Sequence, residues 1–199
     1  MEFEYSSGKI KFSRELSDID RFVIDFVNIL NSLKIKYVIV SGYVAILFGR
    51  ARGTEDIDLF INDIDKNLFD RFVDEIEQKN LWIINTSSGT GAYEMLKDGD
   101  SIRIAKKQTA IPNIEMKIAK EKSDISQLNQ TLQVVINGSG LLISPIEIQI
   151  AFKLWLGSEK DIEDAVYLYE LFKEKLDKQL LLDKCKELNV LEVMNKYVK

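Results

Sequence analysis

The hydrophobic pattern switches repeatedly between two periods over residues 1–143. Apolar residues recur every three or four positions from Arg14 to Leu33 and from Leu68 to Ile76, as on one face of an amphipathic helix. Short β-branched or alternating runs predict strands at residues 37–40, 56–61, 81–84, 92–96, 101–105, 113–118, 131–136 and 141–143. Two further alternating runs within residues 3–12 predict an N-terminal hairpin that turns at Ser6, Ser7 and Gly8.

From residue 144 the pattern is helical throughout. Ser144-Pro145-Ile146-Glu147 has the form of a capping box, and Gly157 would end the helix that begins there. Further helices are expected over residues 158–172, 177–188 and 190–198. The sequence therefore predicts an α/β (α+β) fold: a mixed β-sheet core flanked by helices over residues 1–143, and a helical C-terminal part over residues 144–199.

Two glycine-containing stretches predict turns within the core. Residues 87–91 favour a strand connection, because no helix is predicted after them. Asp98-Gly99 favours a hairpin between the strands predicted at 92–96 and 101–105.

Length and composition indicate a compact protein. The 199 residues are 46% hydrophobic and 30% charged, enough to bury a core. The longest uncharged apolar stretch, Tyr37 to Gly49, is too short to span a membrane, and the first residues lack a signal-peptide pattern. We therefore expect a cytoplasmic protein with no membrane segment.

The residue types that are scarce restrict the chemistry. The chain has no histidine, so acid, base or metal chemistry falls to carboxylates, lysines and hydroxyls. The single cysteine, Cys185, shares an apolar helix face with Leu181 and Leu188 and is expected to be a buried structural thiol. The net charge of −5 gives no long-range attraction to nucleic acid.

Candidate chemistry concentrates in residues 37–62. A strand ends at Ser41-Gly42, where glycine allows a ligand to approach the backbone, and a short helix follows. In the strand at 56–61, alternation places Asp56 and Asp58 on one face, with Cα atoms about 6.6 Å apart. Two such carboxylates repel unless a cation lies between them, and hard oxygen ligands suit Mg²⁺ (or Mn²⁺). This combination predicts a site for a nucleoside triphosphate.

These residues also resemble a known family. Gly42 after a strand, followed by Arg52-x-Thr54-x-Asp56-x-Asp58, is similar to the nucleotidyltransferase superfamily and most similar to its AbiEii-like, abortive-infection toxin branch. The chain has Ser-Gly-Tyr where the superfamily more usually has Gly-Gly or Gly-Ser. Residues 49–53 also look like the Gly-Ser-Arg-x-Arg-Gly element of minimal nucleotidyltransferases, but Gly42 has the strand-to-helix context that phosphate binding requires.

The resemblance assigns roles to individual residues. It implies that Asp56 and Asp58 are catalytic metal ligands, and that Ser41 and Gly42 position the β and γ phosphates. It also implies a third carboxylate from a later strand, for which Glu115 is the candidate, either as a metal ligand or as the acceptor of a proton from an acceptor hydroxyl.

Residues 49–53 form a predicted loop with two arginines, here called the basic loop. Within it, Arg52 is favoured over Arg50 as a phosphate ligand. Thr54 either contributes to the nucleotide site or only bonds its own backbone in a turn.

A second group of candidate nucleotide-binding residues lies in the helical part. Lys153 and the run Lys160-Asp161-Ile162-Glu163-Asp164 resemble further AbiEii-like motifs, with Lys160 where arginine is usual. We expect Lys153 to meet the triphosphate and Lys160 to pair with Asp164, four residues away. Asp161 and Asp164 either only place negative charge at the start of a helix, where the helix dipole favours it, or hold Lys153 in place.

The leading prediction is metal-dependent transfer of a nucleoside monophosphate from a nucleoside triphosphate to an acceptor that the sequence does not name. By resemblance, the acceptor would be tRNA or another RNA, and an antitoxin protein would be a partner. Two alternatives stay open. One is a non-catalytic nucleotide or metal sensor with the same fold, and the other is a small-molecule, antibiotic-type nucleotidyltransferase with an acidic acceptor pocket.

Overall fold

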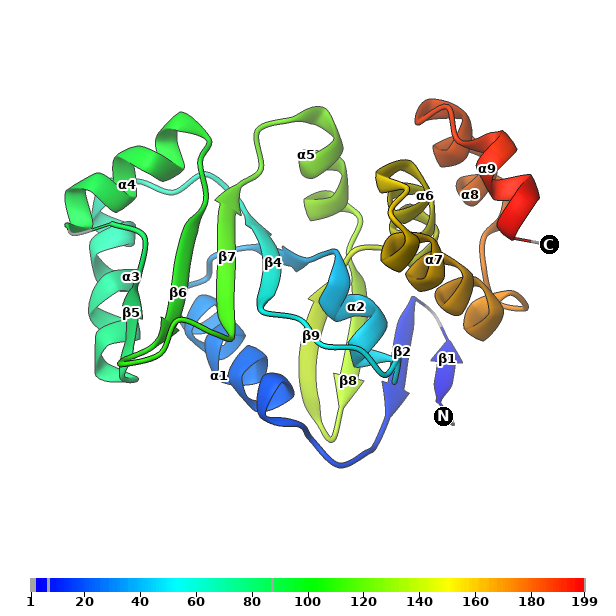
Figure 1. Cartoon of the computed structure of the whole chain (residues 1–199). Coiled ribbons are helices and arrows are strands. Elements are labelled where there is room, and N and C mark those ends of the chain that lie inside the picture. The colour runs from blue at the N-terminus through cyan, green and yellow to red at the C-terminus, as the bar shows by residue number, and fades with distance from the viewer. Residues whose placement is uncertain (1–2, 7, 87, 199) are drawn as a thin grey trace.

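A computed structural model describes residues 3–6, 8–86 and 88–198 (Figure 1). In this part of the chain, nine strands form one mixed sheet in the order β1-β2-β8-β9-β3-β4-β7-β6-β5. The strands are β1 Glu4–Ser6, β2 Lys9–Phe12, β3 Tyr37–Ile39, β4 Asp56–Ile61, β5 Leu81–Ile83, β6 Ile102–Lys106, β7 Asn113–Ile118, β8 Leu132–Ile136 and β9 Ser139–Ile143. The helices are α1 Asp18–Ser32, α2 Gly42–Leu47, α3 Lys66–Gln78, α4 Gly89–Asp98, α5 Lys122–Asn129, α6 Ile146–Leu156, α7 Glu159–Phe172, α8 Lys178–Glu187 and α9 Leu191–Tyr197. The predicted α/β class is confirmed, and β1 and β2 pair as the predicted hairpin, although Ser7 in its turn lies outside the described residues.

Strand β4 is the central element for function. It pairs antiparallel with β3 and parallel with β7, and its register places Asp58 opposite Glu115. Ile57, Leu59 and Ile61 are at most 1% exposed, because alternation directs them into the core. The same alternation directs Asp56 and Asp58 to the other face, as predicted.

Two groups of helices can be followed in Figure 1. Amphipathic helices α1 and α3 pack together, with the rings of Phe26 and Phe72 6.0 Å apart in an edge arrangement. Helices α6 to α9 lie together at one end of the molecule, where α7 packs against α2. The last strand ends at Ile143 and α6 begins at Ile146, so the helical group follows the sheet in the chain. The division into two parts at residue 143 stays a prediction.

Residues 89–98 correct the sequence analysis, since they form helix α4 instead of a strand and a hairpin. The Ser88 side chain caps the helix by accepting from the Gly91 N–H at 3.0 Å, and Gly99, with φ +100°, ends it in the left-handed conformation. Ala92 and Leu96, four residues apart, are both fully buried on the same helix face. The glycine-containing stretch therefore leads into a helix and does not connect strands, although Ser87 lies outside the described residues.

Two other helix starts differ from the expectations. Helix α5 was not predicted, because its buried residues include the polar Asp124 and Gln127 and so give no apolar period. The capping box predicted at Ser144 is wrong: Pro145 is the N-cap and makes no side-chain cap bond, while Glu147 instead accepts from the Asp177 N–H at 2.8 Å. The end of α6 at Gly157 is confirmed.

Cys185 is fully buried, as expected, and burial raises the pKa of its thiol to about 11. Such a thiol is protonated and unreactive at neutral pH. In the described part of the chain, no helix has both the length and the apolar character needed to cross a membrane.

Candidate functional site

The site is centred on the turn between β3 and α2. The Val40 N–H donates to the Asp58 carbonyl at 3.0 Å, which fixes the end of β3 against β4. Ser41 has φ +62°, a conformation that L-residues rarely adopt and that is often found at functional sites. The Ser41 side chain lies near the Asp58 carboxyl group and lowers its pKa, so the turn and the acidic strand influence each other directly.

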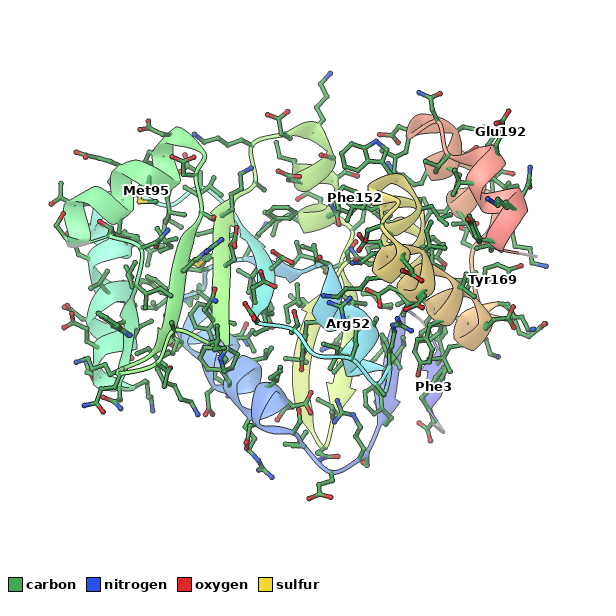
Figure 2. The ribbon with its side chains drawn as sticks, viewed as in Figure 1. Phe3, Arg52, Met95, Phe152, Tyr169 and Glu192 are labelled. Carbon is green, nitrogen blue, oxygen red and sulfur yellow. The ribbon has the colours of Figure 1, made fainter. Side chains whose placement is uncertain are left out.

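Gly42 allows the basic loop to fold back onto this turn. A Cβ atom at Gly42 would lie 2.5 Å from Arg52 Nη2, so only glycine leaves room for the guanidinium as it stands. The structure therefore brings together four predicted site residues: Ser41, Gly42, Arg52 and Asp58. Arg52, which is labelled in Figure 2, lies beside the start of α2.

The aspartate pair lies on one face of β4 and is half-buried. Burial, together with the negative charges of Asp56 and Glu115, raises the pKa of Asp58 to about 6, although the Ser41 hydroxyl and Lys153 act in the opposite direction. The Thr54 hydroxyl donates to the Asp56 carbonyl at 2.9 Å and reaches the Asp56 carboxylate at 3.3 Å. Thr54 therefore makes the backbone turn bond and also contacts a site carboxylate.

Glu115 occupies the predicted strand beside the aspartates, but its carboxylate points toward β6. Oε1 accepts from Ser101 Oγ at 2.8 Å, and Oε2 accepts from Arg103 Nε at 3.1 Å. Across residues 3–6, 8–86 and 88–198, no three side chains of histidine, cysteine, aspartate or glutamate converge as a metal site. The fold aligns the three acidic residues, and the third side chain is turned away from the other two.

Lys153 is held inside the protein close to the aspartates. Its side chain is 3% exposed, and Nζ lies 2.5 Å from an oxygen of Asp161 and 3.3 Å from an oxygen of Asp164. Its positive charge also acts on Asp58 and lowers the pKa of that carboxyl group. Of the two alternatives for Asp161 and Asp164, these ion pairs agree with the one in which both residues hold Lys153 in place.

Asp164 also binds the basic loop. Its buried carboxylate accepts from Arg50 Nε at 2.6 Å and from Arg52 Nη1 at 2.5 Å, and Arg50 additionally pairs with Glu163 at 2.6 Å. The predicted pair between Lys160 and Asp164 is wrong, because Lys160 is exposed while the Asp164 carboxylate faces inward to Arg50, Arg52 and Lys153.

Two functional features escaped the sequence analysis. Gln149, only 1% exposed, accepts from the Ser41 N–H at 2.8 Å and donates to Gln127 at 3.3 Å, so α6 supports the turn. The available signal was the spacing of Gln149 and Lys153, four residues apart on a mostly apolar helix. Both residues direct polar groups toward the site.

The second missed feature is a buried network around Asp20 that anchors α2. Tyr43 Oη donates to the fully buried Asp20 at 2.8 Å, and Arg14 binds the same carboxylate at 2.6 and 2.8 Å. Burial by itself would raise the pKa of Asp20, but the hydrogen bonds from Arg14, Ser17 and Tyr43 outweigh it and lower that pKa. The helix that begins at Gly42 is therefore fixed by a buried charged network.

The residues at the site fit a divalent cation. Asp56 and Asp58 offer carboxylate oxygens from one face, and the pKa of Asp58 is raised first by burial and then by the negative charges of Asp56 and Glu115. Mg²⁺ in nucleotide sites is commonly bound by one or two carboxylates together with substrate phosphates. The pair meets that requirement without Glu115.

Residues 20–196 match the family described as nucleotidyl transferase of unknown function (DUF2204). The chain belongs to this family. No curated protein matches its sequence. The family match does not extend to the AbiEii-like branch, which stays a prediction.

Solved structures with the same fold include a nucleotidyltransferase-like protein and an antibiotic-resistance factor. An antigenic nucleotidyltransferase-like protein from Paracoccidioides brasiliensis is 18% identical, with a TM-score of 0.52 over 92% of this chain and 93% of that one. The antibiotic-resistance factor ANT(2'')-Ia is 11% identical, with a TM-score of 0.51 over 90% of this chain and 99% of that one. At these identities the likeness shows the fold alone.

Proposed function

We propose that this nucleotidyltransferase-family protein transfers a nucleoside monophosphate from a nucleoside triphosphate to a hydroxyl acceptor. The observation that supports this function is the meeting of the Ser41-Gly42 turn, the Asp56 and Asp58 carboxylates and the buried Lys153 ammonium at one place. These groups offer cation ligands and phosphate ligands side by side, as phosphoryl transfer requires.

Each residue has a separate role in the proposed reaction. Asp56 and Asp58 would hold Mg²⁺ or Mn²⁺, which when bound polarises phosphoryl oxygens and offsets charge on the leaving pyrophosphate. The Gly42 backbone would approach the phosphates, while the Ser41 N–H is already bonded to Gln149 and the Ser41 side chain lies near Asp58. Lys153 and Arg52 supply positive charge to the triphosphate.

The remaining candidates act at the edge of this site. Glu115 would complete the cation site or accept the proton of the acceptor hydroxyl, a role suited to a chain without histidine. Asp161 and Asp164 position Lys153 and Arg52 and do not meet the nucleotide themselves. Lys160 is exposed, so any contact with the nucleotide would be made at the protein surface.

The Asp58→Asn variant tests the proposal. It keeps the side-chain shape but removes a cation ligand, so transfer of label from an α-labelled nucleoside triphosphate should fall to background. Asp74→Asn, an exposed change of the same kind on α3, should leave transfer unchanged. Retained transfer in Asp58→Asn would contradict the proposed function.

One alternative is a sensor that binds nucleotide without turnover. The Glu115 carboxylate supports it, because this carboxylate is bonded to Ser101 and Arg103 and points away from the aspartates. Calorimetry separates this alternative from the enzyme. Tight binding of Mg²⁺ with nucleoside triphosphate, and no pyrophosphate release over hours, would support the sensor.

The acceptor is proposed to belong to one of two classes. The AbiEii-like resemblance supports RNA, in a toxin regulated by an antitoxin protein. A groove of about 930 Å³ beside α7 supports a cationic small molecule, because its lining includes three glutamates and two tyrosines: Glu159, Glu163, Glu170, Tyr167 and Tyr197. Arg50 also lines this groove and pairs with one of the glutamates, Glu163. A solved complex of ANT(2'')-Ia contains adenylyl-2''-tobramycin, which supports the second class by fold likeness only.

One labelling experiment compares the two classes. The protein is incubated with each α-labelled nucleotide and either total RNA or an aminoglycoside, and the label is followed into each. Label in RNA alone supports the toxin-like acceptor, and label in the aminoglycoside alone supports the small-molecule acceptor.

A further inference from the structure

A row of charged residues crosses three neighbouring strands on the face that carries the aspartate pair. Asp58 of β4 lies opposite Glu115 of β7, and Glu115 lies opposite Arg103 of β6. Neighbouring strands are about 5 Å apart, so the long Glu115 side chain can reach toward either neighbour. Glu115 thus stands between an acidic strand and a basic residue.

In the structure the Glu115 carboxylate binds residues on the side of β6. Oε1 accepts from Ser101 Oγ at 2.8 Å, and Oε2 lies 3.1 Å from Arg103 Nε and 3.0 Å from Arg103 Nη2. Both carboxylate oxygens therefore have partners on or beside β6. The arginine therefore balances the charge of Glu115 and is paired with neither aspartate of β4.

This arrangement is easily reversed. The Arg103 and Glu115 side chains are 51% and 26% exposed, and ion pairs at such exposure are weak. A divalent cation at Asp56 and Asp58 carries twice the charge of a guanidinium and attracts a third carboxylate more strongly. Only the side-chain torsions of Glu115 need to change, because the strand register already places it beside Asp58.

We propose that Arg103 is a positioning residue that holds Glu115 away from the aspartates, and that Glu115 exchanges Arg103 for a divalent cation when the site is loaded. The inference rests on the proposed function, because it requires Asp56 and Asp58 to bind that cation. Arg103 then acts as an internal counter-ion that competes with the cation for Glu115. The exchange also releases a guanidinium, which has planar donors suited to phosphate, at the edge of the site.

Mn²⁺ alone, titrated into nucleotide-free protein and followed by the electron paramagnetic resonance of free Mn²⁺, tests the exchange. Arg103→Ala removes the competitor, so the Mn²⁺ Kd should fall by about two- to fivefold, as expected for loss of an exposed ion pair. Arg103→Lys, which keeps the charge without the planar fork, should give an intermediate Kd. Arg71→Ala, which removes an exposed arginine from α3, should leave the Kd unchanged.

A double-mutant cycle shows whether Arg103 acts through Glu115. In a Glu115→Gln background, Arg103→Ala should no longer change the Mn²⁺ Kd. The proposal is overturned if Arg103→Ala weakens Mn²⁺ binding, leaves it unchanged in the wild-type background, or tightens it equally in the Glu115→Gln background. Equal tightening would mean a general charge effect.

The same titration separates failure of the exchange from failure of the site. If the wild-type protein does not bind Mn²⁺, or if Asp58→Asn binds it equally well, the cation site of the proposed function is wrong and the exchange falls with it. If Mn²⁺ binds through the aspartates and Arg103→Ala has no effect, only the exchange is wrong.

Discussion

Asp164 shows how much one buried carboxylate contributes to the arrangement of the site. It is fully buried and binds Arg50, Arg52 and Lys153, which come from the basic loop and from α6. Because Arg52 also packs against Gly42, Asp164 controls the position of the guanidinium beside the Ser41-Gly42 turn. The residue therefore links the loop, the turn and the C-terminal helices.

Asp164→Asn should destabilise the protein strongly, because it leaves three cations around a neutral buried amide. Breaking a buried ion pair on one side typically lowers the free energy of unfolding by about 3–5 kcal/mol. Lys160→Ala, an exposed change in the same helical turn, should stay within about 0.5 kcal/mol. Urea denaturation of both variants provides the measurement, and equal stability of the two would contradict the role given to Asp164.

At the scale of elements, short helices depend on their tertiary anchors. Helix α2 has only six residues, and a helix of that length is marginal in water. Tyr43 bonds Asp20 near its start, and Tyr167 Oη donates to the Phe48 carbonyl at 2.8 Å just beyond its end. The position of the Ser41-Gly42 turn is therefore fixed by α1 and α7 as much as by its own sequence.

Helix α4 provides a test of the local structure at residues 89–99. Gly99 has φ +100°, so Gly99→Ala should lower the free energy of unfolding by about 1 kcal/mol. Gly89 begins α4 with open space around its Cα, so Gly89→Ala should be neutral or stabilising by up to about 1 kcal/mol. Thermal or urea denaturation compares the two, and a Gly99→Ala variant as stable as the wild type would argue against the helix end.

At the scale of the whole molecule, the sheet and the C-terminal helices share one set of interactions. Gln149 bonds the Ser41 turn, Asp164 bonds the basic loop, and the rings of Phe48 and Phe172 meet edge to face at 4.8 Å. Separating the two parts would expose buried aromatic rings and leave buried charges unpaired. The two parts should therefore unfold together.

The two tryptophans of the chain allow this to be measured. Trp82 lies in β5 of the sheet and Trp155 lies in α6. In Trp155→Phe the fluorescence reports on the sheet, and in Trp82→Phe it reports on the C-terminal helices. Urea transitions with midpoints that coincide, after correction for any common change in stability, are expected for one cooperative unit. Two well-separated midpoints would instead indicate independent parts divided near residue 143.

Features that depend on neighbours in sequence were determined by the sequence itself. The two-residue period of β4 placed Asp56 and Asp58 on one face, and the bounds of β4 and β7 were predicted correctly. Gly157 ended α6 as expected, because a left-handed residue stops a helix locally. The class of fold and the core of the candidate site follow from such local rules.

Features that depend on residues far apart were decided only by the tertiary structure. Ala92 to Leu96 suited a strand or a helix, and burial against the sheet and α3 selected the helix. The two arginine partners of Asp164 come from a loop more than 100 residues away, so a local rule assigned Asp164 to Lys160 instead. The direction of Glu115 was likewise set by Arg103 on the adjacent strand. Spacing in sequence fixes the face on which a side chain lies, but the choice among charged partners on that face depends on strand order and packing.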